Sequence, residues 1–370
     1  MSPTTPPPQT GETATAEPAG ATKKTPPAAL KYVMLGMFPF LMVVLMVGIM
    51  LSGMHKPLPR DMPVAVVGAT APQAKQATAG LAKGLGDSFD LRALTSEAEA
   101  RALVHDREIA GAYVLPHAGS RQPVLYTAGG AGMSQQQTVQ RTFDQIAAQQ
   151  GATLVNKDLA PLPASDAMGT VTLYLCIGFT MGGFIVVTIM SQAAPELMRL
   201  KRMLPVLAAW AVFIAGCVSL LTGPIIGAHH GHFWAVLGLG SAMAFTVSLV
   251  TAVFARFLGG LAVIPAVTLM MFLGVPSSNG GVALHMVPGL FQALHGVLPL
   301  PALVESIRAV LYFDGDGVAG HLGTLGIWAG AALLVNVVWE LRKRRRTTRT
   351  PGASGAPAGA QPRVQEAEAV

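Results

Sequence analysis

Residues 170–190 read TVTLYLCIGFTMGGFIVVTIM and contain no charged side chain. About 20 apolar residues in a helix are enough to cross ~30 Å of hydrocarbon, so this stretch predicts a transmembrane helix. Runs of the same kind recur along the chain, at Tyr32–Leu51, Met203–Ile226, Phe233–Ala255, Phe257–Val275 and Leu322–Trp339. The sequence therefore predicts an α-helical polytopic membrane protein with about six transmembrane helices.

The composition agrees with a membrane protein. Hydrophobic residues make up 51% of the 370 residues, charged residues only 12%, and the mean hydropathy is +0.49. Soluble domains carry about 25% charged residues. The net charge is +6, but no basic face with interleaved aromatic residues is present. We therefore expect the lipid bilayer as a partner and no nucleic acid.

Basic residues of short loops predict the orientation, because Lys and Arg accumulate on the cytoplasmic side. With the N-terminus inside, thirteen basic residues lie on the inner side and only Arg308 lies in a short outer loop. The inner set is Lys23, Lys24, Lys31, Arg199, Lys201, Arg202, Arg256, Arg342, Lys343, Arg344, Arg345, Arg346 and Arg349. This bias predicts a multi-pass protein of the cell membrane with both termini cytoplasmic.

Five segments follow from this topology. They are a disordered cytoplasmic tail at 1–31, a first transmembrane helix at 32–53, an extracytoplasmic α/β domain at 54–169, a five-helix transmembrane domain at 170–341, and a basic, then disordered cytoplasmic tail at 342–370. The first helix is expected to be a retained anchor, since its apolar run is too long for a signal peptide.

The 54–169 segment has its own pattern of strands and helices. The strand candidates are Pro63–Val67, Phe89–Ala93, Ile109–Leu115 and Val124–Thr127. The helix candidates are Gln73–Leu85, Ser96–Val104 and Ser134–Gln149, with Ser96 or Thr95 able to cap the second. Strands that alternate with helices predict a small α/β domain.

Chemistry-bearing motifs are absent from the sequence. It contains no nucleotide-binding P-loop, nucleophile elbow, H-E-x-x-H or C-x-x-C pattern, so we expect no enzymatic activity and no cofactor in this chain. His229, His230 and His232 form either a metal site or a short loop of solvated histidines. None of the six apolar runs carries an ionisable residue in its middle, whereas ion-coupled transporters usually keep one there.

A charged segment connects the second and third runs. Gln192–Pro205 reads QAAPELMRLKRMLP, with Pro195 suited to a first helical position. Glu196 would lie in the first turn, and the basic residues would end the helix, as the helix dipole favours. These basic residues are Arg199, Lys201 and Arg202. The pattern predicts either a short helix on the cytoplasmic surface, where a soluble partner can push, or an ordinary basic loop.

The segment 276–321 is apolar but interrupted by prolines and glycines. It predicts a re-entrant or interfacial helical hairpin at the outer leaflet. Leu303, Ile307 and Leu311 form part of an apolar helical stripe, with Glu305 and Arg308 off it. These two charged residues are three apart, so they are predicted to pair.

Several short motifs resemble permeases of the ABC type-2 exporter class, particularly the phage-infection-protein-like (YhgE/Pip) branch. The motifs are Met62-Pro-Val-Ala-Val-Val-Gly68, Asn279-Gly-Gly, Pro288-Gly-Leu-Phe291, Leu298-Pro299 and Arg308-Ala-Val-Leu-Tyr312-Phe313. The resemblance covers about residues 30–345. It implies an exporter permease that acts as a homodimer or heterodimer, and a separate ATP-binding-cassette ATPase as partner. It also implies a coupling segment at 192–205 and a broken outer hairpin that contains Pro288, Phe291, Pro299 and Tyr312.

Two other functions remain open from the residues alone. A non-transporting, membrane-anchored surface or assembly protein could use the outer domain to bind a partner. An ion-coupled secondary transporter is disfavoured by the absence of ionisable residues in the middle of the runs. An exporter permease that moves an amphipathic substrate is the leading expectation.

Overall fold

The structure is a computed structural model that describes residues 28–117, 122–229 and 231–348. The chain divides into two compact units, Met1–Val44 and Leu45–Val370, and all contacts below lie within the second. The helices are α1 (Ala28–Met54), α2 (Ala71–Leu85), α3 (Glu97–His105), α4 (Met133–Gln149), α5 (Val171–Ala193), α6 (Leu200–Leu220), α7 (Phe233–Leu258), α8 (Val263–Val267), α9 (Gly289–His295), α10 (Pro299–Tyr312) and α11 (Val318–Thr348).

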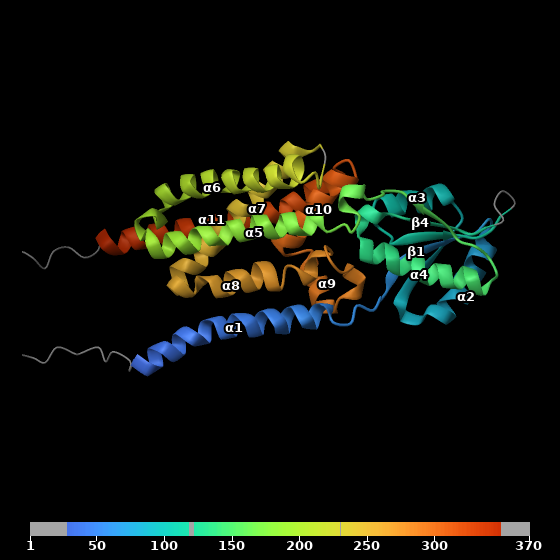
Figure 1. Ribbon diagram of the computed structural model, residues 1–370, viewed down its shortest axis with the longest axis horizontal. Coiled ribbons are helices and arrows are strands. Elements are labelled where there is room, and N and C mark those ends of the chain that lie inside the picture. Colours follow the sequence, from blue (N-terminus) through green and yellow to red (C-terminus); the bar gives the residue numbers. More distant parts are fainter. Residues whose placement is uncertain (1–27, 118–121, 230, 349–370) are drawn as a thin grey trace, which may run out of the picture. The chain divides into compact units, whose positions relative to one another are not determined.

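A five-stranded sheet forms the α/β part (Figure 1). Its strands are β1 (Met62–Val67), β2 (Phe89–Leu94), β3 (Gly111–Val114), β4 (Val124–Thr127) and β5 (Val155–Asp158). The order is β2-β1-β3-β4-β5, and all neighbours are parallel except β3 and β4. The interior strand β1 is apolar and buried, as expected for a strand covered on both faces.

Alternation along β1 sends side chains to two separate cores. Ala65 and Val67 pack on one face with residues of α3, while Val64 and Val66 pack on the other with residues of α2 and α4. Segments from beyond the domain complete both cores. Phe313 joins the first, and Met286 joins the second. Residues from 283–313 therefore contact the α/β domain on both sides of its sheet.

The predicted strands and helices of this domain are present within a few residues. Ser96 caps α3 by accepting a hydrogen bond from the Glu99 amide at 3.2 Å. The strand β5 was missed, because Val155–Asp158 reads VNKD and has only one apolar residue. It is an edge strand whose side chains are largely exposed, so no apolar alternation marks it.

Four helical stretches among the described residues are long and apolar enough to cross a membrane. They are Val171–Ala193, Leu200–Ile225, Phe233–Ser278 and Val318–Arg345. A fifth is possible if α9 and α10, which meet at a 67° bend, count as one broken span. The protein is thus a mostly helical, multi-pass membrane protein, and the count of six stays a prediction.

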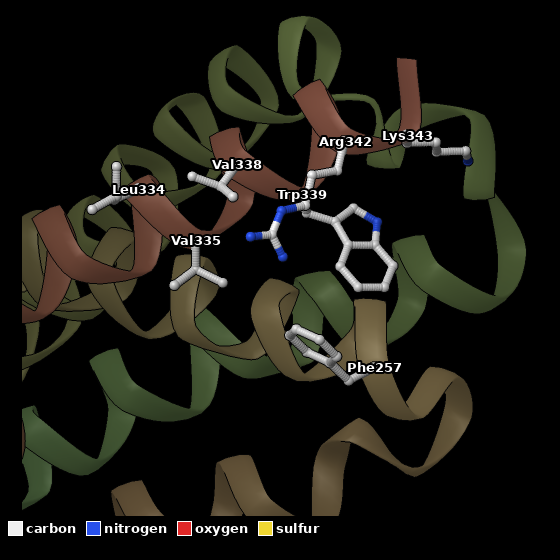
Figure 2. A pocket seen from close by; sticks show the side chains of 7 residues that line it. All are labelled: Phe257, Leu334, Val335, Val338, Trp339, Arg342 and Lys343. Carbon is white, nitrogen blue, oxygen red and sulfur yellow. The ribbon is translucent and has the colours of Figure 1, made fainter. Parts of the chain in front are cut away.

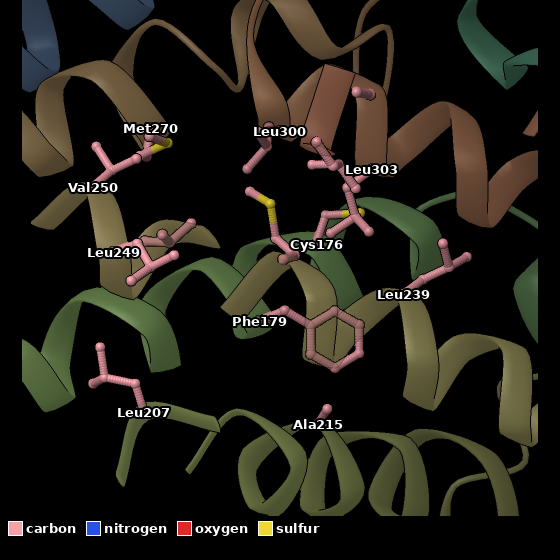
Figure 3. Close-up of a cluster of buried hydrophobic side chains, with 14 of the residues drawn as sticks. Cys176, Phe179, Leu207, Ala215, Leu239, Leu249, Val250, Met270, Leu300 and Leu303 are labelled. Carbon is pink, nitrogen blue, oxygen red and sulfur yellow. The ribbon is translucent and has the colours of Figure 1, made fainter. Parts of the chain in front are cut away.

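The stretch Phe233–Ser278 has 46 residues, about twice the length that one crossing needs. Gly259 interrupts it with a φ of 56°, a conformation that only glycine adopts readily. Val250 and Met270 lie in one buried cluster, which indicates that the chain reverses between them (Figure 3). The predicted break at Arg256 is wrong by three residues, because Arg256 lies in the last turn of α7.

The helix α7 lies at the centre of the bundle and packs against α5, α6, α10 and α11. Its closest approach is to α5. A Cβ added at Gly183 would lie 2.6 Å from the Ala244 carbonyl oxygen, and the Ser248 hydroxyl donates to the Gly183 carbonyl at 2.9 Å. Of the small-residue pairs seen in the sequence, Gly182 packs against Ile214. An added Cβ at Gly326 or Gly330 would meet no described atom within 4 Å.

Candidate functional site: two polar junctions at the ends of the helical bundle

The broken pair α9–α10 is defined by its prolines. Pro288 is the N-cap residue of α9, and Pro299 occupies the first turn of α10, where a missing amide hydrogen has no cost. Phe291 is buried and lies against Gly53, where an added Cβ would come within 3.0 Å of the ring. The Trp328 indole of α11 donates to the Val297 carbonyl at 2.8 Å and so anchors the bend.

The helix α10 is buried on every side from Pro299 to Ala309. This burial does not fit the interfacial alternative, in which one face of the helix would meet water, and the re-entrant hairpin at 276–321 stays a prediction. α10 packs against α5, α7 and α11, and Glu305 and Arg308 are only 7% and 2% exposed. Their polar groups are satisfied by protein rather than by water.

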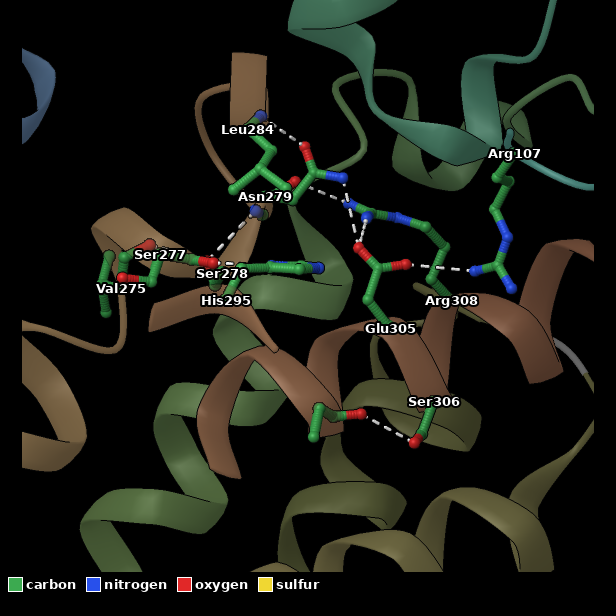
Figure 4. A network of polar contacts seen from close by, with 12 residues as sticks. Arg107, Val275, Ser277, Ser278, Asn279, Leu284, His295, Glu305, Ser306 and Arg308 are labelled. Atoms are coloured by element: carbon green, nitrogen blue, oxygen red, sulfur yellow. Dashed lines mark hydrogen bonds and ion pairs between the residues drawn. The ribbon is translucent and has the colours of Figure 1, made fainter. Parts of the chain in front are cut away.

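The predicted Glu305–Arg308 pair is present, and it belongs to a larger network (Figure 4). Arg308 Nη1 donates to Glu305 Oε1 at 2.7 Å, and Arg308 Nη2 donates to the Asn279 carbonyl at 2.9 Å. The Asn279 amide donates to the same Oε1 at 3.2 Å, while its Oδ1 accepts from the Leu284 amide at 3.0 Å. Asn279 has a φ of 58°, which asparagine tolerates better than most residues.

Arg107 brings the α/β domain into this network. It follows α3 and donates from Nη1 to Glu305 Oε2 at 3.1 Å, and from Nη2 to the Asp316 carbonyl at 2.9 Å. Its guanidinium also lies 4.9 Å from the centre of the Phe313 ring. Burial lowers the pKa of Arg107, and the Glu305 carboxylate opposes that shift. One carboxylate thus joins the domain to the helical bundle through two arginines.

A polar cavity of about 260 Å³ adjoins the network. Side chains from the domain, the hairpin and α11 line it, including Gln135, His285, His295 and His321. Burial lowers the pKa of His285, which favours its neutral form. The cavity offers imidazoles and amides around one charged network, which suits a polar group better than an apolar one.

Tyr312 links α10 to the segment that precedes α5, in addition to the contacts of the Glu305 network. Its hydroxyl donates to Asp166 Oδ2 at 2.8 Å, and Asp166 Oδ1 accepts from the amides of Thr170 and Val171 at 2.9 and 3.2 Å. Asp166 therefore caps α5 and holds Tyr312 at the same time. Gly130 of the α/β domain packs on Tyr312 so closely that an added Cβ would lie 2.7 Å away.

The charged segment 192–205 differs from its prediction. Only Pro195–Met198 forms a short 3₁₀ turn, and α6 begins at Leu200. Arg199, Lys201 and Arg202 thus open α6 instead of closing a short surface helix, which places them against the helix dipole. Glu196 and the three basic residues are all exposed. The short charged segment is present, but the prediction of a separate surface helix is wrong.

The three basic residues at the start of α6 belong to a larger charged cluster. Arg199, Lys201 and Arg202 line a cavity of about 440 Å³ together with the last residues of α11, namely Glu340, Lys343 and Arg344. Among the described residues, Glu340 is the only acidic group that lines this cavity, and it pairs with Arg344 at 3.5 Å. The fold therefore gathers two basic segments, far apart in sequence, into one cationic surface.

Arg256 ties this surface to the bundle. Its Nε donates to Asn336 Oδ1 at 2.6 Å, and its Nη2 donates to the Met198 carbonyl at 3.2 Å. Asn336 is fully buried in α11 and donates to the Leu249 carbonyl of α7 at 3.1 Å. One arginine thus connects the 195–198 turn to α7 and α11.

Three residues of these junctions were missed in the sequence. Arg107 stands between two acidic residues and is typical of a solvated charge, and Asp166 lies in a loop. Asn336 is a polar residue inside an apolar run, which was a usable signal for a buried interhelical contact. His230 of the histidine cluster lies outside the described residues, and no group of metal-ligating side chains was found among those described.

Comparison with known proteins agrees with these features. A family model for an ABC-2 family transporter protein matches residues 32–338. The match includes the α/β domain and most of α11. No curated protein matches the chain.

Proposed function

The chain belongs to the ABC-2 transporter family, and we propose that it is the permease subunit of an exporter whose ATP hydrolysis takes place in a separate ATPase. The permease acts as a dimer, homomeric or heteromeric. Its α/β domain lies outside the cell, and both of its termini are cytoplasmic. The family match over 32–338 carries this proposal, and the two polar junctions supply a mechanism for it.

The two junctions are separated along α11. The outer network reaches Asp316, just before α11, and the Arg256 junction contains Asn336. Twenty residues of helix span about 30 Å at 1.5 Å per residue. An ATPase that docks on Arg199, Lys201 and Arg202 would push on the 195–198 turn, and Arg256 would transmit the displacement to α7 and α11. Both helices pack against α10, which carries the outer network.

Energy from ATP fits the outer network better than energy from an ion gradient. Proton-coupled transporters need an intramembrane carboxylate that can gain and lose a proton. Glu305 is buried, but both of its oxygens accept hydrogen bonds from arginines, and Oε1 accepts a third from Asn279. A carboxylate held in this way is suited to joining the α/β domain to the helical bundle.

We further propose an amphipathic substrate. The bundle is apolar, whereas the cavity of about 260 Å³ beside the outer network is lined by amides, imidazoles and charged groups. A molecule with both characters can leave the bundle and meet polar groups at its exit. The hairpin, with Glu305 and Arg308, forms one wall of this exit.

Inside-out membrane vesicles test the proposal. Vesicles from cells that produce the chain should accumulate an amphipathic fluorescent dye when ATP is added, and vesicles with an Arg256→Ala variant should accumulate less. A non-hydrolysable ATP analogue should give no uptake, and a proton ionophore should leave uptake unchanged. Uptake that follows a proton gradient instead of ATP would favour a secondary transporter. No uptake of any dye in a panel, with normal chain levels, would favour the surface-protein function.

A further inference from the structure

An apolar groove lies at the end of the last candidate span. It has a volume of about 630 Å³ and is lined by Phe257 of α7 and by residues of α11, namely Leu334, Val335, Val338, Trp339, Arg342 and Lys343. Phe257 and Leu334 are 61% and 62% exposed. The rings of Phe257 and Trp339 meet edge to face with centres 4.8 Å apart, so the groove has a rigid aromatic end.

A cation lies over this groove. Arg342 follows Val338 by four residues and Trp339 by three, so all three share one face of α11. Figure 2 shows the guanidinium of Arg342 folded back over the groove, between Val335 and Trp339, while Lys343 points away from it. A cation beside an apolar hollow suits a ligand that has both an anionic group and apolar chains.

The groove lies at the level where such a molecule occurs. The apolar run of α11 ends at Trp339, and the basic cluster begins at Arg342. Tryptophan is enriched at the boundary between hydrocarbon and headgroups, and basic residues at that boundary attract anionic lipids. The apolar hollow therefore lies at acyl-chain depth, and Arg342 lies at headgroup depth.

We propose that this groove is a binding site for an anionic phospholipid, with an acyl chain against Phe257 and Val338 and the phosphate at Arg342. Lys343, at the rim, adds positive potential. Arg342 lines this groove and not the cationic cavity of about 440 Å³, whereas Lys343 lines both. The site adds to the proposed export function and does not depend on it, since it requires only that α11 lies in a membrane.

Trp339 provides a fluorescent reporter inside the site. The full-length protein is reconstituted in phosphatidylcholine vesicles that contain an equal small fraction of dibrominated phosphatidylglycerol or dibrominated phosphatidylcholine. Bromine quenches tryptophan on contact, and subtracting the signal of a Trp339→Phe variant isolates Trp339 from the other three tryptophans. We expect phosphatidylglycerol to quench Trp339 at several-fold lower mole fraction than phosphatidylcholine.

Charge variants locate the anion site. One basic residue near the surface contributes about 1 kcal/mol to anionic lipid binding, or about fivefold. Arg342→Gln should therefore raise the phosphatidylglycerol fraction needed for half quenching about fivefold. The matched control Arg345→Gln removes the same charge one turn further along α11, outside the groove lining, and should change it less than twofold.

Four results would overturn the proposal. Equal quenching by the two lipids in the unsubstituted protein would show that the groove has no preference for an anionic headgroup. Equal effects of Arg342→Gln and Arg345→Gln would show diffuse attraction without a site. Absence of quenching by either lipid would show that protein, such as a second copy of this chain, covers the groove. Inorganic phosphate at millimolar concentration should not relieve the quenching, and relief by phosphate would assign Arg342 to a soluble anion.

Discussion

Glu305 is the residue on which the outer junction depends. It is the shared partner of Arg107 and Arg308, and it is almost fully buried. Burying charges costs several kcal/mol per ion, and paired geometry with further hydrogen bonds is needed to offset this cost. Arg308 gains a second acceptor in the Asn279 carbonyl, and Arg107 gains one in the Asp316 carbonyl. Each of the three charged side chains has at least two polar partners, so removing one member takes a bond from another buried charge.

Removal of Glu305 should be the most damaging change in this network. Glu305→Ala leaves two arginines facing each other, whereas Arg107→Ala or Arg308→Ala leaves the carboxylate with one cation. We expect a loss of about 3–5 kcal/mol for Glu305→Ala, and smaller losses for the arginine variants. The measurement is unfolding of the purified protein in detergent.

The double variant Glu305→Ala with Arg308→Ala provides the control for direct pairing. It should lose less stability than the sum of the single variants, because contacting residues are not additive. If the losses add strictly, the two residues do not act on each other, and the network does not hold the junction together.

At the scale of elements, the sequence predicts those helices and strands whose formation depends on local sequence pattern. The strands β1 to β4 and helices α2 to α4 follow from apolar alternation and a capping serine, and the apolar runs follow from their length. Burial of α10 could not be predicted in this way. Charged residues such as Glu305 and Arg308 usually indicate an exposed helix face. Here they are buried because residues 107 and 279, far away in sequence, supply their polar partners.

The prediction of a short helix at 192–205 is also wrong: its basic residues suggested a helix end, yet Arg199, Lys201 and Arg202 open α6, where they share a cavity with Glu340, Lys343 and Arg344 of α11. A single helix turn has only a modest dipole preference, so the sign of its charges does not fix which helix end they occupy. The reversal at Gly259 instead of Arg256 was also hard to predict, since the two residues lie only three apart within one long apolar stretch.

The contact between α5 and α7 offers a sharp test at this scale. A Cβ on Gly183 would lie 2.6 Å from the Ala244 carbonyl and 2.8 Å from Val247 Cβ, so the helices would have to separate. We expect Gly183→Ala to destabilise the protein by about 1–3 kcal/mol, as overpacking does. The change is read as a lower midpoint of thermal unfolding in detergent.

Gly178→Ala is the matched control on the same helix. Its nearest neighbour would be Val218 at 3.7 Å, an ordinary contact, and alanine favours a helix over glycine. This variant should be neutral or slightly stabilising. An equal loss for both variants would mean that the close approach at Gly183 does not hold α5 against α7.

At the scale of the whole molecule, the family match and the apolar helices agree on a multi-pass membrane permease. The orientation remains a prediction from the basic residues. The structure adds that the cationic surface around Arg199 and the network around Glu305 lie at different ends of α11. An exporter that an ATPase drives from one side of the membrane, and that releases substrate on the other, requires two such separate sites.

Cysteine labelling in intact cells tests that orientation. Cys176 is buried and Cys217 exposed, so both are first replaced. A membrane-impermeant thiol reagent should then label Gln137→Cys, which is exposed on α4, and should leave Thr348→Cys unlabelled until the cells are opened. Labelling of Thr348→Cys in intact cells would reverse the orientation and place the cationic surface outside.

The most direct test of a permease driven by a separate ATPase is recovery of that ATPase. The full chain, purified in mild detergent, should bring with it a nucleotide-binding subunit, and the pair should hydrolyse ATP. The double variant Glu196→Arg with Arg199→Glu should lose most of the subunit, whereas Gln137→Arg in the α/β domain should retain it. The account is contradicted if no ATPase accompanies the chain, or if the subunit stays bound and active after the charges at 196 and 199 are reversed.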